Sequence, residues 1–183
     1  MKLQVTVRVV IAVLLALVVA SILRTARALP ALGALRPEVT LKDAWERSIT
    51  LSRFRGMPVL VVYEDKGSST QNQRLKDDLA RLGQGDRYKQ SVGLVAVADV
   101  SGYDYWPVRG FVKDAIQSES AKQHTTIYCD WDGHVRASLG LEKGMSNIVL
   151  FGKDGKVLFA ASGTVSDQRR EELVRILRHE VEG

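Results

Sequence analysis

The most reactive side chain in the sequence is the thiol of Cys129, the only cysteine among 183 residues. A single cysteine cannot form a disulfide or a dithiol pair within the chain. It can be a small buried apolar residue, or an exposed thiol that forms mixed disulfides or reacts with peroxide. The second role requires solvent access and a basic neighbour such as His124 or His134. We expect a buried residue, and the reactive thiol stays open as the alternative.

The same segment groups side chains that bind metal ions, because Asp130, Asp132 and His134 follow Cys129 within six residues. Zinc sites usually carry their ligands in spaced pairs, which this sequence lacks. The run Asp130–Gly133 is typical of a turn between two strands. We therefore predict a hairpin turn and no metal site. The sequence also has no glycine-rich phosphate loop and no order of residues typical of a catalytic triad, and we expect no cofactor.

Three short segments are candidates for binding another molecule: a hydroxyl-rich turn, an aromatic loop, and a polar pair before an apolar run. Their residues are Ser68, Ser69, Thr70, Tyr103, Tyr105, Trp106, Ser146 and Asn147. The hydroxyl-rich turn either caps a helix, with Ser68 or Ser69 as N-cap, or contacts a ligand or peptide. The aromatic loop either contacts a protein or packs over the end of a sheet.

The apolar pattern predicts the elements that position these segments. The β-branched run 59–63 and the run 92–100 are typical of strands buried on both faces. Between them, leucines at 75, 79 and 82 indicate one face of a helix. A second helix is predicted over 107–123, with Val108, Phe111, Val112 and Ala115 on its inner face.

The second half of the chain predicts further strands at 126–129 and 135–139, and a hairpin of 146–151 with 156–161. The Asp-Gly pair at 154–155 is a strong hairpin signal. A terminal amphipathic helix follows over 166–181. Two strands joined through a helix should be parallel, whereas the hairpin is antiparallel. The predicted fold class is therefore α/β, with a central mixed β-sheet and helices on both faces.

The first 28 residues differ in composition from the rest. They contain four basic residues, no acidic residue, and the apolar run Val9–Leu23. This run of 15 residues is shorter than the roughly 20 that cross a bilayer. It suits a signal peptide ending near Ala28, or an uncleaved N-terminal membrane anchor. Residues 29–38 read as a linker, and 39–183 as one domain.

The charge distribution argues against nucleic-acid binding. The whole chain carries +5, and removing the four basic residues of 1–28 leaves +1 for the remainder. A nearly neutral domain lacks the basic surface that binds phosphate backbones. Membrane contact is expected only through the N-terminal segment.

Several segments resemble known families. Residues 39–63 and 128–141 are similar to segments of thioredoxin-like redoxins and peroxiredoxins, and "IVLFGKDGKVLFAASG" (148–163) resembles the hairpin that follows in both. The stretches "FVKDAIQSES" (111–120), "IYCDWDG" (127–133) and 146–163 are most similar to the exported YtfJ-type family. This resemblance implies a thioredoxin-like fold over 39–183.

The chain departs from these families at the residues that carry their chemistry. Thioredoxins start their first helix with Cys-x-x-Cys, whose positions fall near Gly67 and Thr70, and no cysteine occurs before 129. Thioredoxins also place a cis-proline before the hairpin. Here Met145, Ser146 or Asn147 stands there, and we expect a trans bond because a cis bond at a non-proline residue costs about 2.5–4 kcal/mol.

We therefore predict an exported thioredoxin-like domain without a competent dithiol site. It is expected to be a periplasmic binding or accessory module that contacts another protein or peptide through the three candidate segments. One alternative is an enzyme, a divergent peroxiredoxin-like or thiol oxidoreductase redoxin using Cys129. Another is a membrane-tethered scaffold, which requires that 1–28 stay uncleaved. The domain would be periplasmic, or anchored in the inner membrane and facing the periplasm.

Overall fold

The computed structural model describes residues 29–183, apart from the side chains of residues 86, 87 and 89. The predicted signal peptide or anchor, 1–28, lies outside the described residues. Within 29–183 no helix is both long enough and apolar enough to cross a membrane. The strands are β1 (Thr40–Lys42), β2 (Ser48–Thr50), β3 (Val59–Glu64), β4 (Gly93–Asp99), β5 (Ile127–Asp130), β6 (Asn147–Phe151) and β7 (Val157–Ser162). The helices are η1 (Leu51–Phe54), α2 (Gln73–Gly83), α3 (Asp86–Ser91), η2 (Ser101–Tyr103), α4 (Val108–Gln123), α5 (His134–Leu139) and α6 (Asp167–Glu182).

The main sheet has five strands in the order β5-β4-β3-β6-β7. Strands β3, β4 and β5 run parallel, whereas β6 is antiparallel to β3 and β7 is antiparallel to β6. The predicted mixed sheet and its terminal hairpin are therefore confirmed. The strand pair expected within 39–54 forms a separate small sheet, in which β1 pairs antiparallel with β2.

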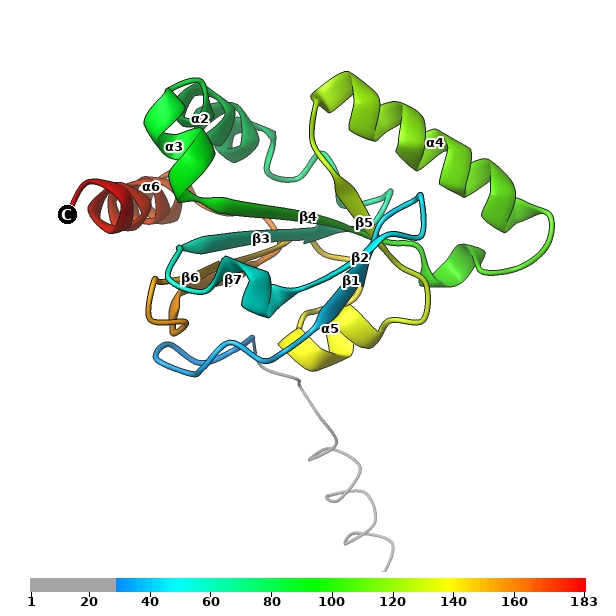
Figure 1. Cartoon of the computed structure of the whole chain (residues 1–183), viewed down its shortest axis with the longest axis horizontal. Helices are drawn as coiled ribbons and strands as arrows, with labels where there is room; N and C mark the ends of the chain where they lie inside the picture. The colour runs from blue at the N-terminus through cyan, green and yellow to red at the C-terminus, as the bar shows by residue number, and fades with distance from the viewer. Residues whose placement is uncertain (1–28) are drawn as a thin grey trace, which may run out of the picture.

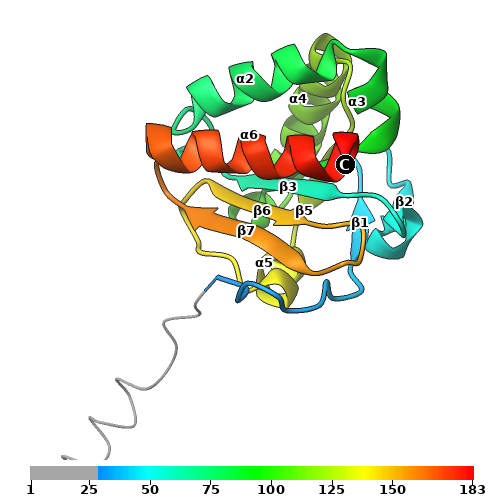
Figure 2. The same ribbon diagram turned by 90° about the vertical axis from the view of Figure 1, so that its left-hand side faces the viewer.

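Helices cover both faces of the main sheet, as predicted (Figures 1 and 2). Alternating side chains of β3 explain this layering, because successive residues of a strand point to opposite faces. Leu60 and Val62 pack in the core beneath α2 and α6. Val59, Val61 and Tyr63 pack on the other face, in the core that includes side chains of α5, β1 and η1.

The expected strand at 135–139 is wrong, because these residues lie in α5. Asp130 and Gly133 explain the difference. The Asp130 carboxylate accepts hydrogen bonds from the backbone N–H groups of Val135 and Arg136, which are free at the start of a helix. Gly133 has φ +74°, so the chain turns directly into the helix rather than into a hairpin strand.

The predicted inner face of α4 is wrong in two of its four positions. Phe111 is 69% exposed, and Ala115 is also exposed. The side chains that pack inward are Val112 and Ile116, which contact the small core around Cys129. Helix α3 is not among the predicted elements.

Candidate functional site

The carboxyl edge of the sheet brings together most of the predicted site. Because β3, β4 and β5 are parallel, their last residues, Glu64, Asp99 and Asp130, end at the same edge. Strand β6 runs in the opposite direction and pairs Asn147 with Tyr63, so its first residues start there too. Ligand sites of open α/β sheets usually lie beyond this edge.

The turn between β3 and α2 is closed by its own side chains. Ser68 is fully buried, and its hydroxyl and its N–H both lie 2.7 Å from Asp65 Oδ1. Ser69 donates to the carbonyl of Lys66 at 3.2 Å, while Thr70 is exposed. The predicted N-cap at Ser68 or Ser69 is wrong, because α2 begins at Gln73. Both serine side chains form hydrogen bonds within the turn instead. Serine often bonds nearby groups in this way, which competes with helix formation.

A buried polar network ties this turn to the start of β6. Ser146 Oγ donates to Glu64 Oε1 at 2.7 Å and accepts from Asn72 Nδ2 at 2.9 Å. The N–H of Ser146 donates to Gln71 Oε1 at 3.1 Å. Lys76 Nζ pairs with Glu64 Oε2 at 3.0 Å. We call Glu64, Gln71, Asn72, Lys76 and Ser146 the polar network. It lies beside the turn where the resemblance would place a dithiol, and Ser146 stands at the place of the cis-proline. The donors and acceptors of the network already bond one another.

Asn147, the other polar residue predicted here, holds a loop. Its Nδ2 donates to the carbonyls of Glu142 and Met145, and its Oδ1 accepts from the Glu142 N–H at 2.9 Å. The side chain is fully buried. Within the described residues the one cis peptide is Trp106–Pro107, so the expected trans bonds around Ser146 are confirmed.

Cys129 is buried in β5, with 5% of its surface exposed. It packs with Ala44 and Val100 beneath α4. Burial, followed by the Asp43 carboxylate, raises the pKa of the Cys129 thiol to about 12. At neutral pH the thiol is therefore protonated, and the protonated form is not a nucleophile. The cysteine is therefore a core residue in this conformation, as the sequence predicts.

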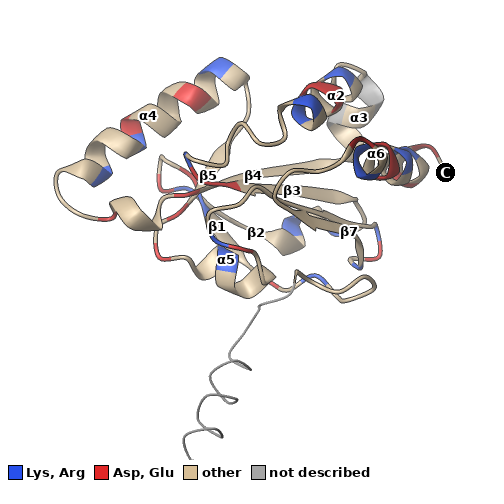
Figure 3. Ribbon diagram, turned by 180° about the vertical axis from the view of Figure 1, so that it is seen from behind, with Lys and Arg blue, Asp and Glu red and all other residues tan. Residues whose placement is uncertain are grey.

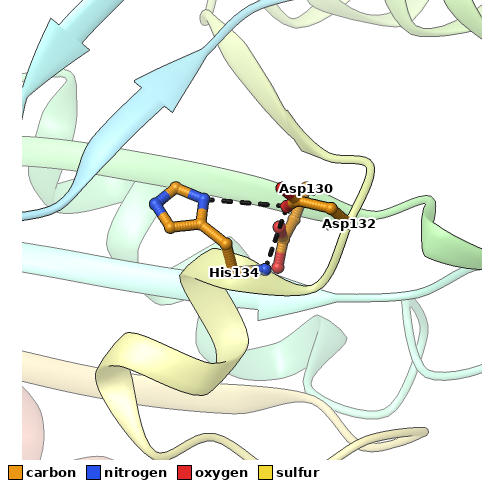
Figure 4. Close-up of side chains that lie close together, drawn as sticks. All are labelled: Asp130, Asp132 and His134. Carbon is orange, nitrogen blue, oxygen red and sulfur yellow. Dashed lines mark hydrogen bonds and ion pairs between the residues drawn. The ribbon is translucent and has the colours of Figure 1, made fainter.

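Asp130, Asp132 and His134 do lie together, with possible ligand atoms within 4.8 Å of one another (Figure 4). Asp130 is buried, however, and its two oxygens already accept from the Tyr63 hydroxyl and from two backbone N–H groups. Asp132 accepts from the His134 N–H at 3.1 Å, which lowers the pKa of that carboxyl. A metal ion would have to displace bonds that cap α5, so the geometry fits a hydrogen-bonded turn.

The aromatic loop lies on the surface. Tyr103, Tyr105 and Trp106 are 36%, 58% and 91% exposed. Phe111, one turn into α4, adds a fourth exposed ring that the sequence interpretation had assigned to the core. We call these four residues the aromatic surface. The sequence left open whether this loop packs over the end of the sheet. Trp106 does not pack there, because its side chain is almost fully exposed.

The base of the aromatic surface is held by charged contacts. The Arg109 guanidinium stacks 4.5 Å from the ring of Trp131 and pairs with Asp104. Lys113 pairs with Glu46 of the β1–β2 loop at 3.1 Å, and Gln117 donates to the Ala44 carbonyl at 2.8 Å. These contacts hold α4 against the β1–β2 loop and Trp131, while the ring of Phe111 stays outside.

The parallel β3-β4-β5 unit, the β6-β7 hairpin and the helices on both faces define a thioredoxin-like domain, here without a cysteine pair. A family model described as "Bacterial protein of unknown function (YtfJ_HI0045)" matches residues 63–180. The chain therefore belongs to this family, in agreement with the resemblance found in the sequence. The search of curated proteins found no match.

Solved structures with the same fold include thiol–disulfide proteins. A candidate protein disulfide isomerase from Bacteroides thetaiotaomicron is 15% identical, with a TM-score of 0.64, covering 84% of this chain and 92% of its own. A candidate thiol:disulfide interchange protein DsbE from Chlorobium tepidum is 18% identical, with a TM-score of 0.58, covering 81% and 96%. The exposed lipoprotein thioredoxin of Streptococcus pneumoniae is 12% identical, with a TM-score of 0.55, covering 78% and 99%. At these identities the likeness establishes the fold alone.

Proposed function

We propose that this chain is a non-catalytic thioredoxin-like binding module that acts outside the cytoplasm and contacts another protein or peptide through its aromatic surface. The observation that carries the proposal is the exposure of Trp106, at 91%, and Phe111, at 69%, beside a sheet edge that has no cysteine pair. Exposed aromatic side chains grouped on one loop and the adjoining helix turn are typical of protein contact sites, and aromatic side chains dominate the binding energy of protein interfaces.

The polar network supports a role without thiol chemistry. In a dithiol enzyme the first turn of the helix after β3 carries the nucleophile. Here Asn72 and Ser146 fill that region and hydrogen-bond each other. The buried Cys129, whose raised pKa keeps it protonated, gives little support to the alternative of a Cys129-dependent redoxin.

Two observations support a location outside the cytoplasm. Residues 1–28 combine basic residues with an apolar run, and the proteins of similar fold include an exposed lipoprotein. Whether 1–28 is cleaved decides between a free periplasmic module and a membrane-tethered scaffold. The intact mass of the protein isolated from its own cells separates these two forms.

The binding proposal is tested by placing a photo-crosslinking amino acid at Trp106 of the full-length protein in living cells. The matched control carries the same amino acid at Leu32, another apolar residue, which is 70% exposed in the linker 29–38. We expect a discrete protein adduct from position 106, none from 32, and loss of the adduct when Phe111→Ser is added. Equal adducts from both positions, or none from 106, would refute the proposal.

The proposal that the module is non-catalytic is tested separately, because a binding module could also catalyse thiol chemistry. The purified protein is expected neither to reduce insulin disulfides nor to consume peroxide. Turnover that disappears in Cys129→Ser would refute this part and establish the redoxin alternative.

A further inference from the structure

A second surface, away from the aromatic one, carries a groove of about 660 Å³ between α2 and α6. Its floor includes the apolar side chains of Leu82 and Val174. Four arginines line it, against two carboxylates. The arginines are Arg81, Arg170, Arg175 and Arg178, and the carboxylates are Asp78 and Glu171. We call this the arginine groove; Figure 3 shows basic residues in blue on both helices.

The positive charges of the groove are incompletely neutralised. Arg81 and Arg170 both pair with one carboxylate, Asp78, and Arg170 also reaches Asp167 at 3.3 Å. Across the described part of the chain, neither Arg175 nor Arg178 has an ion-pair or hydrogen-bond partner for its side chain. A groove whose cations exceed its anions is complementary to a negatively charged ligand.

Arg170 also keeps an unsatisfied donor. Its Nε is buried and has no hydrogen-bond acceptor among the described residues, although its two terminal nitrogens are paired. A buried donor without an acceptor is costly, so the positive charge of Arg170 is incompletely balanced. Guanidinium groups bind carboxylate oxygens with two parallel hydrogen bonds, which favours an anion with planar oxygen pairs.

The shape of the groove distinguishes between kinds of anion. Arg170 and Arg178 are eight residues apart on α6, which corresponds to about 12 Å along the helix axis. A single small anion would contact one end and leave the apolar floor uncovered. An extended peptide places every second side chain about 6.6 Å apart on one face. Acidic side chains at every second position could therefore meet successive arginines, and the peptide would span the length of the groove.

A membrane surface fits this groove less well. Helices α2 and α6 cover one face of the sheet, and the first described residues run beneath the other face, near α5 (Figure 2). The groove thus points away from the side on which the chain enters the domain.

We propose that the arginine groove binds an extended acidic segment of a partner protein, with a carboxylate at every second residue. This goes beyond the binding proposed for the aromatic surface and is independent of it. Asp78 stays with Arg81 and Arg170, whereas Glu171, which has no ion-pair partner among the described residues, opposes the ligand.

The test uses the full-length protein in a non-ionic detergent and a fluorescent heptapeptide of alternating glutamate and leucine. We expect saturable binding that weakens as salt is added. The double variant Arg175→Gln/Arg178→Gln should weaken it by about tenfold or more, since each arginine contributes a charge-assisted bond. The control is the double variant Arg53→Gln/Arg55→Gln. It removes two exposed arginines on the opposite face of the sheet, one within η1 and one at its C-cap. Glu171→Gln should tighten binding.

Other outcomes would overturn the proposal. These are no saturable binding, equal loss in the η1 control, or equal binding of a peptide with glutamine in place of glutamate. Binding of inorganic phosphate that competes fully with the peptide at similar concentration would indicate a small-anion site instead. Preferential binding to vesicles of anionic phospholipid would indicate a membrane contact. Trp106→Ala should leave peptide binding unchanged, so failure here is distinct from failure of the aromatic surface.

Discussion

Replacing Asn72 by alanine tests whether the polar network stabilises the fold in place of a disulfide. The Asn72 side chain is 4% exposed and makes three hydrogen bonds. Its Nδ2 donates to Ser146 Oγ and to the Gly163 carbonyl, and its Oδ1 accepts from the Val165 N–H at 2.8 Å. One side chain therefore joins the turn before α2 to both ends of the β6-β7 hairpin.

The expected cost follows from these three bonds. Each contributes about 1 kcal/mol net, and its loss leaves a polar group without its partner. Gly163 and Val165 are half-buried, so water can replace part of their bonding. We therefore expect Asn72→Ala to lower the free energy of unfolding by about 2–3 kcal/mol, a large fraction of the 5–15 kcal/mol typical of a domain.

The assay is urea unfolding followed by circular dichroism, with an unchanged slope against denaturant as the sign of a pure stability change. Thr70→Ala, in the same turn but exposed, is the control and should stay within about 0.5 kcal/mol. A double-mutant cycle with Ser146→Ala should give a coupling of about 1 kcal/mol. A loss below about 1 kcal/mol for Asn72→Ala, or no coupling, would refute the reasoning.

Three further results are expected. The pKa of Cys129 is raised from 9.0 to about 12 in the folded state, so its contribution to stability is complete below pH 9 and is lost as the pH rises toward 12. The stability difference between the wild type and Cys129→Ala should therefore shrink above pH 9, by up to about 1.4 kcal/mol per pH unit, in unfolding measured across that range. Phe111→Ser should change stability by less than about 0.5 kcal/mol, whereas Ile116→Ala should cost about 1–2 kcal/mol, and equal effects in the same urea assay would contradict the assigned face of α4. Gly93→Ala should cost about 1–3 kcal/mol, because the added Cβ would lie 2.5 Å from the ring of Phe54, and Phe54→Leu should recover part of the loss in thermal melts.

The strands of the main sheet were predictable because their composition and length favour a buried strand over a helix or a loop. Continuous β-branched runs such as 59–63 are too apolar for a surface and too short for a helix. The Asp-Gly turn at 154–155 also fixed the β6-β7 hairpin, since Gly155 adopts φ +78°. Fold class followed from the order of these elements.

Two of the errors in the helices, the face of α4 and the strand expected in place of α5, have a common physical cause: contacts from outside the helix decide both. The spacing of apolar residues in α4 allows two stripes. One contains residues 108, 111, 112 and 115, and the other contains 108, 112 and 116. Periodicity alone does not select between them. The β1–β2 loop selects the second stripe, through the bonds of Lys113 and Gln117. Likewise, α5 depends on Asp130, a cap contributed by the preceding strand.

The candidate site was only half predictable. The sequence located the hydroxyl-rich turn around 68–70 and the missing cysteines, because both follow from composition. It did not reveal that Asn72 and Ser146 bond each other, since they are 74 residues apart and either residue is ordinary in a loop. The arginine groove was missed for the same reason, because its arginines come from α2 and α6.

The hydrogen bonds of the β3–α2 turn also bear on how this domain could regain thiol chemistry. Ser68→Cys would place sulfur beside the Asp65 carboxylate, which now lies 2.7 Å from the serine hydroxyl. A neighbouring negative charge and burial both raise the pKa of a thiol, the reverse of what a nucleophile needs. A single cysteine introduced at this position would thus give a protonated thiol rather than a nucleophile, unless Asp65 were replaced as well.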